Sequence, residues 1–364
     1  MNGGLEELSH KMPYSYCQPA AGRQRAPQMR PANPRVILRW IGLTAALMCA
    51  AAAVGATRPQ YGGTLRVESR LTADTPDPPA LVGAGFQLAR WEAGRLAVYE
   101  ADEGASGGRP FLNGVEVQFG RGLREQASDL DLEKADLVEL GPNELRRAPA
   151  GRRVWSSNPV RVLALVFSAR VEDARVREAL VLALDRSAIH AVLLQRQGEV
   201  SGALLPQWLS GYAFLFPVAA DLSRARQLAA GARPLTLGVP DAAMRPIAER
   251  IVVNARDVGL AISVTQSGGA DVSLLELRIA GTDAGKALGQ LAAALGPAGT
   301  GTAPLGRVDT PELVYAAERA MLEGFRVIPL AHLPDVYGVG PRVKGGSGVA
   351  PSGEWRFEGL WLGR

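Results

Sequence analysis

The stretch DARVREALVLALDRSAIHAVLLQRQGEV, residues Asp173–Val200, predicts two consecutive packed helices. Asp173 is a residue type that begins helices, because its carboxylate accepts first-turn N–H groups that have no partner inside the helix. Apolar residues then recur at i, i+3 and i+4, which is the pattern of one buried helix face. We expect Arg175, Arg177 and Glu178 to lie off this face, in contact with water. The apolar face comprises Val176, Ala179, Leu180, Ala183 and Leu184.

The second half of the stretch repeats the pattern. Asp185 can begin a helix that carries Ile189, Val192 and Leu193 on its apolar side. Gly198 can end that helix in a left-handed conformation.

Segments on both sides of this stretch have the composition of strands. Residues 61–69 predict a turn and a short strand, and residues 81–119 predict several short strands separated by turns. We expect residues 128–134 to form a solvated turn. Residues 160–169, VRVLALVFSA, are typical of a strand buried on both faces. Residues 234–265 predict a strand, a helix and a returning parallel strand.

The segment DARVREALVLALDRSAI also resembles the signature D-VR-AL-A-DR-I that opens the second lobe of family 5 solute-binding proteins. These are the extracytoplasmic receptors for peptides, nickel complexes and related solutes in ABC importers. The start YGGTLRVES, the segment ADVSLLEL with Asp271 in the family's Asp position, and the end EWRFEGLWL are similar to the family as well. The resemblance covers roughly residues 61–362. It implies an α/β, two-lobed periplasmic-binding-protein-like fold (type II), with mixed sheets flanked by helices and more than one chain crossing between the lobes.

The chain departs from the family pattern in two places. Family members carry a small extra subdomain after the first strand, whereas only about a dozen residues join the corresponding segments here, so we expect that subdomain to be missing. After ADVSLLEL, the family's acidic DYPDP-type loop, which in peptide receptors holds the ligand's ammonium group, is replaced by RIAGTDAGKALGQLAAALG. The family's ligand anchor therefore has no counterpart in this sequence.

The domain organisation follows from the same resemblance and from the N-terminal sequence. Residues 1–56 have the positive, apolar and small-residue parts of a secretory signal, ending in Val54-Gly55-Ala56, and form either a cleaved signal peptide or an N-terminal anchor. We expect lobe I to comprise residues 57–158 and 329–364, and lobe II to comprise residues 159–328. The protein would then be periplasmic or otherwise extracytoplasmic.

Charge and cysteine content exclude several classes of function. The net charge is +4, but the N-terminal segment before Ala56 holds six of the 40 basic residues and two of the 36 acidic ones. The remainder carries 34 residues of each sign, which argues against nucleic-acid binding through a basic face. Both cysteines, Cys17 and Cys49, also precede the expected cleavage site, so the mature protein would have no disulfide and no cysteine-ligated metal.

The sequence contains no pattern typical of an enzyme or of a metal or cofactor site. G-x-S-x-G, Walker, G-x-G-x-x-G and H-E-x-x-H motifs are absent. His10 lies in the leader, and His190 and His332 are isolated, which favours packed or surface histidines over metal ligands. We therefore expect no catalysis, no cofactor and no metal.

The sequence thus predicts a monomeric, exported receptor that binds a small peptide or related solute by hinge closure and delivers it to an ABC-transporter permease. The candidate ligand contacts are Arg70, Phe167, Ser168 and Trp208. Core packing is the alternative for Phe167 and Trp208, and a surface ion pair is the alternative for Arg70. A different class of function stays open too: a non-transporting two-lobed scaffold that has lost solute binding and interacts with another protein.

Overall fold

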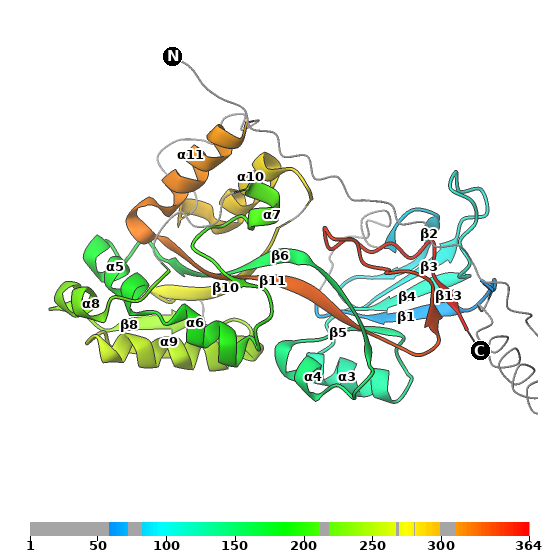
Figure 1. Ribbon diagram of the computed structural model, residues 1–364, viewed down its shortest axis with the longest axis horizontal. Coiled ribbons are helices and arrows are strands. Elements are labelled where there is room, and N and C mark those ends of the chain that lie inside the picture. The colour runs from blue at the N-terminus through cyan, green and yellow to red at the C-terminus, as the bar shows by residue number, and fades with distance from the viewer. Residues whose placement is uncertain are drawn as a thin grey trace, which may run out of the picture. The chain divides into compact units, whose positions relative to one another are not determined.

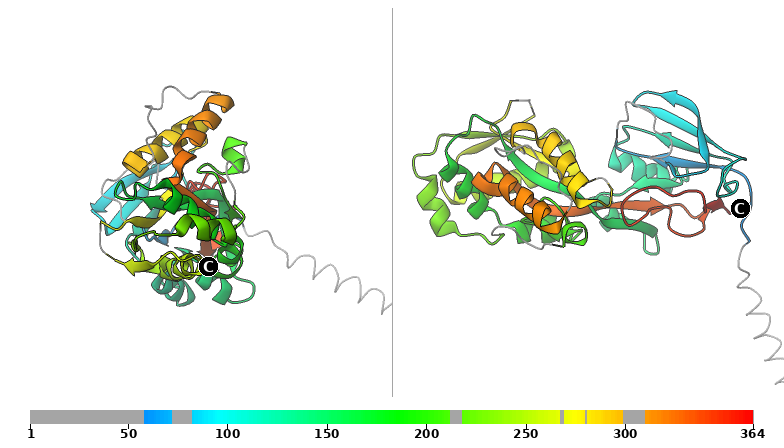
Figure 2. Two further views of the ribbon diagram at one scale, coloured as in Figure 1. Left: turned by 90° about the vertical axis from the view of Figure 1, so that its left-hand side faces the viewer. Right: turned by 90° about the horizontal axis from the view of Figure 1, so that it is seen from above.

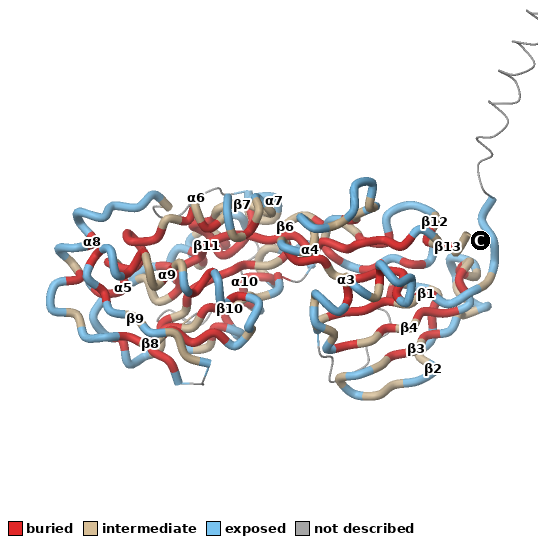
Figure 3. Tube along the Cα trace, turned by 90° about the horizontal axis from the view of Figure 1, so that it is seen from below, coloured by how far each residue is buried: buried red, intermediate tan, exposed pale blue. Residues whose placement is uncertain are grey.

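Two long antiparallel strands, β6 (Arg153–Phe167) and β11 (Val327–Val339), form the centre of the sheet in this computed structural model. The structure describes residues 58–71, 82–211, 218–266, 269–279, 281–298 and 310–363. In Figure 1 the two strands run side by side from the region of α5, α8 and α9 to the region of β1 and β4. Every residue of β11 is buried, as Figure 3 shows.

Eleven described strands pair into one mixed sheet. Its order is β2-β3-β4-β1-β5-β11-β6-β10-β8-β9, with β7 paired to β11 off this path. The remaining strands, in chain order, are β1 (Thr64–Glu68), β2 (Phe86–Glu92), β3 (Leu96–Ala101), β4 (Gly114–Gln118), β5 (Leu137–Glu139), β7 (Glu199–Val200), β8 (Leu235–Gly238), β9 (Ile262–Thr265), β10 (Val272–Arg278), β12 (Val343–Lys344) and β13 (Trp361–Leu362), the last two forming a separate pair.

Helices cover both faces of the sheet, and Figure 2 shows α10 and α11 side by side. In chain order the helices are α3 (Leu123–Asp131), α4 (Pro142–Arg147), α5 (Ala174–Ala183), α6 (Arg186–Ala188), η1 (Ile189–Leu193), α7 (Gln207–Ser210), α8 (Leu222–Ala229), η2 (Ala242–Met244), α9 (Arg245–Asp257), α10 (Ala284–Leu295), η3 (Gly296–Ala298), α11 (Pro311–Leu322) and η4 (Glu323–Phe325).

The alternation of side chains along β6 explains why its sequence is apolar from Val162 to Phe167. Leu163 and Leu165 pack in one core with α5, α8 and α9, while Val162 and Ala164 pack in another with α10 and α11. Successive side chains of a strand point to opposite faces, so a strand covered on both sides must be apolar at every position. The predicted strand is confirmed, but it begins at Arg153 rather than at Val160.

The C-terminal segment shares a core with the first strand. Leu65 and Val67 of β1 pack in one cluster with Trp355, Phe357 and Leu360. The two ends of the described chain therefore build one core, as the resemblance implies.

The predicted helix after Asp173 is confirmed, with one error. The Asp173 carboxylate accepts a hydrogen bond from the Arg175 backbone N–H and begins α5. Arg177, however, is only 5% exposed rather than in contact with water. Its guanidinium donates to the backbone oxygens of Gly324, Val171 and Glu172, because α5 packs against η4 on the side that sequence periodicity assigns to solvent.

The second predicted helix is shorter and less regular than expected. Asp185 does begin it, accepting from the Ala188 N–H, but only α6 and one π-helical turn follow. Val192, predicted to face the core, is 62% exposed. Gly198 has φ +70°, and a Cβ there would lie 1.9 Å from the His332 backbone oxygen. Glycine is thus required by the close approach of this segment to β11 and not only by a helix end.

Two other predictions have different outcomes. The strand–helix–strand unit is confirmed, since β8 and β9 flank α9 and pair in parallel. The predicted turn at residues 128–134 is wrong in its first half, because residues up to Asp131 belong to α3. Leu130, which is 3% exposed, anchors that helix in a small core with Val138 and Val336.

A buried carboxyl group lies in the core beneath α11. Glu318 is 0% exposed, and its Oε1 accepts the backbone N–H groups of Leu204 at 2.5 Å and Leu205 at 2.9 Å. Within the described residues its Oε2 has no hydrogen-bond partner. Burial raises the pKa of Glu318 from 4.5 to about 7 although the two N–H groups act in the opposite direction.

This raised pKa predicts a loss of stability between about pH 4.5 and pH 7, because the folded state binds a proton that the unfolded state has already released. The shift corresponds to about 3 kcal/mol. We expect Glu318→Gln to match the parent at pH 4.5 and to exceed it by up to about 3 kcal/mol at pH 8. Urea unfolding across this range measures the difference, with exposed Glu312→Gln on the same helix as the control. Equal pH profiles for the parent and Glu318→Gln would contradict the prediction.

Candidate functional site

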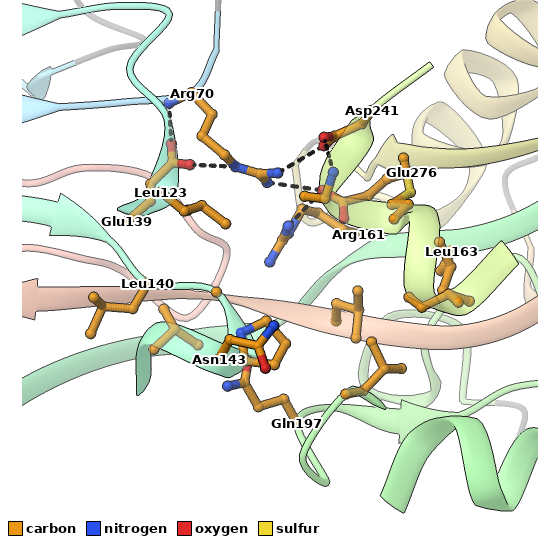
Figure 4. Close-up of a pocket in the computed structure, with 18 of the residues that line it drawn as sticks. Arg70, Leu123, Glu139, Leu140, Asn143, Arg161, Leu163, Gln197, Asp241 and Glu276 are labelled. Carbon is orange, nitrogen blue, oxygen red and sulfur yellow. Dashed lines mark hydrogen bonds and ion pairs between the residues drawn. The ribbon is translucent and has the colours of Figure 1, made fainter. Parts of the chain in front are cut away.

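A cavity of about 370 Å³ lies where the ends of β1 and β5 approach β6, β10 and the start of α9. Figure 4 shows its wall, with Arg70 and Glu139 on one side and Asp241 and Glu276 on the other. Apolar side chains complete the wall, among them Leu71, Leu123, Leu140, Val192, Met244 and Ile247. The volume is at the low end of the roughly 300–1,000 Å³ typical of small-molecule sites.

Arg70 pairs with carboxylates from three separate segments around the cavity. Its Nε lies 3.0 Å from Glu139 Oε2, its Nη1 lies 3.2 Å from Asp241 Oδ2, and its Nη2 lies 3.2 Å from Glu276 Oε1. Glu139 ends β5, whereas Asp241 precedes α9 and Glu276 lies in β10. Ser69 Oγ also donates to Glu139 Oε1 at 2.6 Å.

A second group of charges continues the network along β6. Arg161 Nη1 donates to Glu276 Oε1 at 2.6 Å, and its Nε lies 3.0 Å from Asp335 Oδ1. Asp335 Oδ2 in turn accepts from Arg278 Nη1 at 2.7 Å. All three cavity-lining guanidinium groups are therefore already paired with carboxylates.

The ion pairs favour the charged forms of Glu276 and Arg70. Burial opposes ionisation of Glu276 most strongly, but attraction to Arg161 and Arg70 outweighs it and lowers the pKa of Glu276. In the same way, burial acts against the charge of Arg70, yet Glu276 and Glu139 raise the pKa of its guanidinium. These ion pairs persist at neutral pH.

Two side-chain amides lie away from the ion pairs, as Figure 4 shows. Asn143 and Gln197 both line the cavity. Gln197 Nε2 is buried and, among the residues that the structure describes, has no hydrogen-bond acceptor. A buried N–H group without a partner is costly, so a rotation of this side chain that brings the amide to an acceptor would be favourable.

The four candidate contacts from the sequence do not come together around this cavity. Arg70 lines it, whereas Phe167, Ser168 and Trp208 do not. Phe167 is 1% exposed in the core beside α5, and the Ser168 N–H donates to the Asp271 backbone oxygen. Trp208 Nε1 donates to the Pro159 backbone oxygen at 2.7 Å. A role of these three residues in binding stays a prediction.

Sequence patterns did not indicate Glu139, Asp241 and Glu276, the three carboxylates that hold Arg70. Glu276 had a signal, because it is the one charged residue in the apolar run VSLLEL, and such a residue needs a partner once the strand is buried. Glu139 has the same character in the short strand β5. Nothing in the sequence indicates that both strands direct their carboxylates at one arginine.

Glu199, His332 and Ser201 lie in an order that superficially resembles a hydrolase triad. Glu199 Oε1 is 3.3 Å from His332 Nδ1, and His332 Nε2 is 3.2 Å from Ser201 Oγ. Ser201 Oγ, however, donates to the Ala203 backbone oxygen at 2.7 Å, and His332 Nε2 lies 3.1 Å from the Leu204 oxygen. A carbonyl oxygen only accepts, so the Ser201 hydroxyl directs its proton to Ala203 and not to His332, unlike a serine activated by a histidine. At 2% exposure, His332 is a packed histidine, as predicted.

The described ranges of the chain contain no group of three or more His, Cys, Asp or Glu side chains able to hold a metal ion. None of their helices combines the length and apolarity needed to cross a membrane. The predicted signal segment, residues 1–56, lies outside the described residues.

Comparison with known proteins agrees with this architecture. The family model described as bacterial extracellular solute-binding proteins, family 5 (middle), matches residues 43–272, more than half of the 364-residue chain. No curated protein sequence matches the chain.

Several solved structures have the same fold at low sequence identity. The ABC transporter substrate-binding protein CtaP from Listeria monocytogenes is 15% identical with a TM-score of 0.60, over 76% of this chain and 66% of CtaP. A dipeptide-binding protein from Pseudoalteromonas, solved with Met-Leu, is 14% identical with a TM-score of 0.60, over 77% of this chain and 64% of that protein. DppA from Helicobacter pylori, solved with the peptide STSA, is 17% identical with a TM-score of 0.63, over 77% of this chain and 63% of DppA. The chain thus spans 63–66% of the length of these proteins, and identities this low show the fold alone.

Proposed function

Because this chain belongs to family 5 of the bacterial extracellular solute-binding proteins, we propose that it is the substrate-binding component of an ABC importer for small peptides or related solutes. The observation that carries the proposal is the cavity bounded by Arg70 and Glu139 at the ends of β1 and β5 on one side, and by Asp241 before α9 and Glu276 in β10 on the other. A solute bound in this cavity would contact residues on both of these sides. Its partners are that solute and the membrane permease, and its function is binding without a chemical step.

The two crossing strands support a hinge. Pro159 of β6 lies opposite Pro334 of β11, and the register between the strands shifts on both sides of Pro334. Proline has no N–H to donate, so the ladder is weakest at this pair. A weakly bonded crossing lets the two halves rotate while the sheet on either side stays intact.

We propose that the lobes have the boundaries expected from the sequence, residues 57–158 with 329–364 and residues 159–328. The packing supports a division near Pro159, since Trp155 belongs to the core of β1 and Leu163 to the core of α5. Along β11 the packing changes between Leu333 and Tyr337, a few residues beyond residue 329. An extracytoplasmic location, with residues 1–56 as signal or anchor, and a monomeric state belong to the same proposal.

A solute screen on the full-length chain tests this function. A ligand at about one hundred times its Kd stabilises the folded protein by about 2.7 kcal/mol, which raises Tm measurably. We expect such a rise with a peptide or a related small solute, together with a smaller radius of gyration in X-ray scattering.

The scaffold alternative predicts the opposite result. Co-purification of a partner protein, with no change in Tm across peptides, sugars and metal complexes, would reject solute binding in favour of a non-transporting interaction protein.

A further inference from the structure

The charges around the cavity indicate which solutes it accepts, provided that it binds a solute as proposed above. Among the residues that the structure describes, its lining contains three arginines and four carboxylates, Glu139, Asp241, Glu276 and Asp335, which gives these residues a net charge of −1. We propose that the site takes a small amphipathic monocation, an amine with an apolar body and a neutral polar end, and discriminates against carboxylate-bearing anions.

Each guanidinium group of the described lining is already paired with at least one carboxylate. Arg70 contacts three carboxylates, Arg161 contacts two and the Pro334 backbone oxygen, and Arg278 contacts Asp335 and the Gly353 oxygen. A carboxylate ligand would therefore meet no unneutralised cation, and it would add a negative charge to a lining in which carboxylates are already in excess. Drawing a guanidinium away from its carboxylate is strongly unfavourable, because it leaves a charge without compensation.

The carboxylates retain capacity for a cation. An ionised carboxylate has about four lone-pair positions. Asp241 receives the Arg70 guanidinium on Oδ2 and the Ala243 N–H on Oδ1, and its side chain is 41% exposed. In the part of the chain that the structure describes, the hydrogen bonds to Glu276 from Arg70 and Arg161 both end on Oε1. An ammonium group can therefore join these carboxylates without breaking an existing pair.

The rest of the wall fits an apolar body with a neutral acceptor. Leu71 and Val192 line the cavity while 53% and 62% of their surfaces are exposed, so an apolar ligand would remove them from water. The buried Gln197 Nε2 offers a donor, which pairs with a carbonyl oxygen.

A series of solutes with one body and different charges tests the inference. Leucinamide carries one positive charge at about pH 6.5, since the pKa of an α-amino group is about 7.7–8.0. N-acetyl-leucinamide is neutral and N-acetyl-leucine is anionic. We expect calorimetry on the full-length chain to give the lowest Kd for leucinamide, at least about tenfold below that of N-acetyl-leucine.

Asp241→Asn neutralises the lining charge while its amide oxygen still accepts the Ala243 N–H. We expect it to weaken leucinamide binding about tenfold and to leave N-acetyl-leucinamide almost unaffected. Asp257→Asn, the same change at an exposed position outside the cavity, is the matched control and should bind like the parent.

The outcomes separate this inference from the proposed function. Equal or tighter binding of N-acetyl-leucine, or an undiminished preference for leucinamide in Asp241→Asn, overturns the cation preference and leaves solute binding in place. Failure of all three probes to bind also overturns the inference, whereas the proposed function fails only with the broad solute screen.

Discussion

Replacing Arg70 with methionine should destabilise the protein by about 2–4 kcal/mol and enlarge its radius of gyration in the absence of solute. The side chain of Arg70 is 27% exposed and is the shared partner of Glu139, Asp241 and Glu276. Without the arginine, Glu139 would face Asp241 and Glu276 across the cavity. The attraction that joins these segments would then become a repulsion between carboxylates. A fully buried pair would lose about 3–5 kcal/mol, and partial exposure reduces that figure.

Urea unfolding and X-ray scattering of the full-length chain measure these two effects. Arg95→Met is the matched control, because Arg95 is 82% exposed and pairs only with nearby Glu92 among the described residues. Exposed pairs contribute about 0–1 kcal/mol, so this variant should resemble the parent. If Arg70→Met kept both the parent stability and the parent radius, the ion pairs across the cavity would not hold its two sides together.

Truncating Phe357 to alanine should cost about 3–5 kcal/mol, the range found for buried aromatic side chains. Phe357 is 0% exposed and packs in the cluster that contains Leu65 and Val67 of β1. It also stacks on Trp355, with ring centroids 5.4 Å apart. Its loss would leave a cavity in the core where the C-terminal segment packs with the first strand.

Chemical denaturation again gives the free energy, and Leu313→Ala, at a position 50% exposed on α11, is the control for a truncation that creates no cavity. A loss below about 1 kcal/mol for Phe357→Ala would show that the C-terminal segment contributes little to the core around β1, contrary to its packing.

The helices and strands that the sequence predicts correctly are those whose residue pattern depends only on neighbouring residues in the chain. The periodicity after Asp173 predicts α5 correctly, and the apolar run around Leu163 predicts β6, because each pattern records the burial of its own neighbours. The same periodicity assigns Val192 to the core and Arg177 to solvent, and both assignments are wrong. Their environments depend on which element packs against them, and periodicity carries no information about that.

Of the residues that form the ion pairs around Arg70, only Arg70 itself could be predicted from the sequence. Arg70 could be singled out because it follows the first strand, but its three carboxylate partners lie 69, 171 and 206 positions away along the chain. Trp208, a candidate ligand contact in the sequence, donates to the Pro159 oxygen beside the crossing between the two cores. The sequence around Trp208 would be the same whether its side chain contacts a ligand or hydrogen-bonds to the backbone.

The sequence by itself determined the family, the α/β class, the parallel unit around α9 and the absence of a net charge beyond residue 55, since these follow from local periodicity, residue order and composition. Only the tertiary structure decided that Arg70 is shared between Glu139, Asp241 and Glu276, and that the described residues lining the cavity carry one excess negative charge. The physical reason is that an ion pair depends on the distance between atoms in space, and that distance is set by how the strands assemble and not by the spacing of residues along the chain.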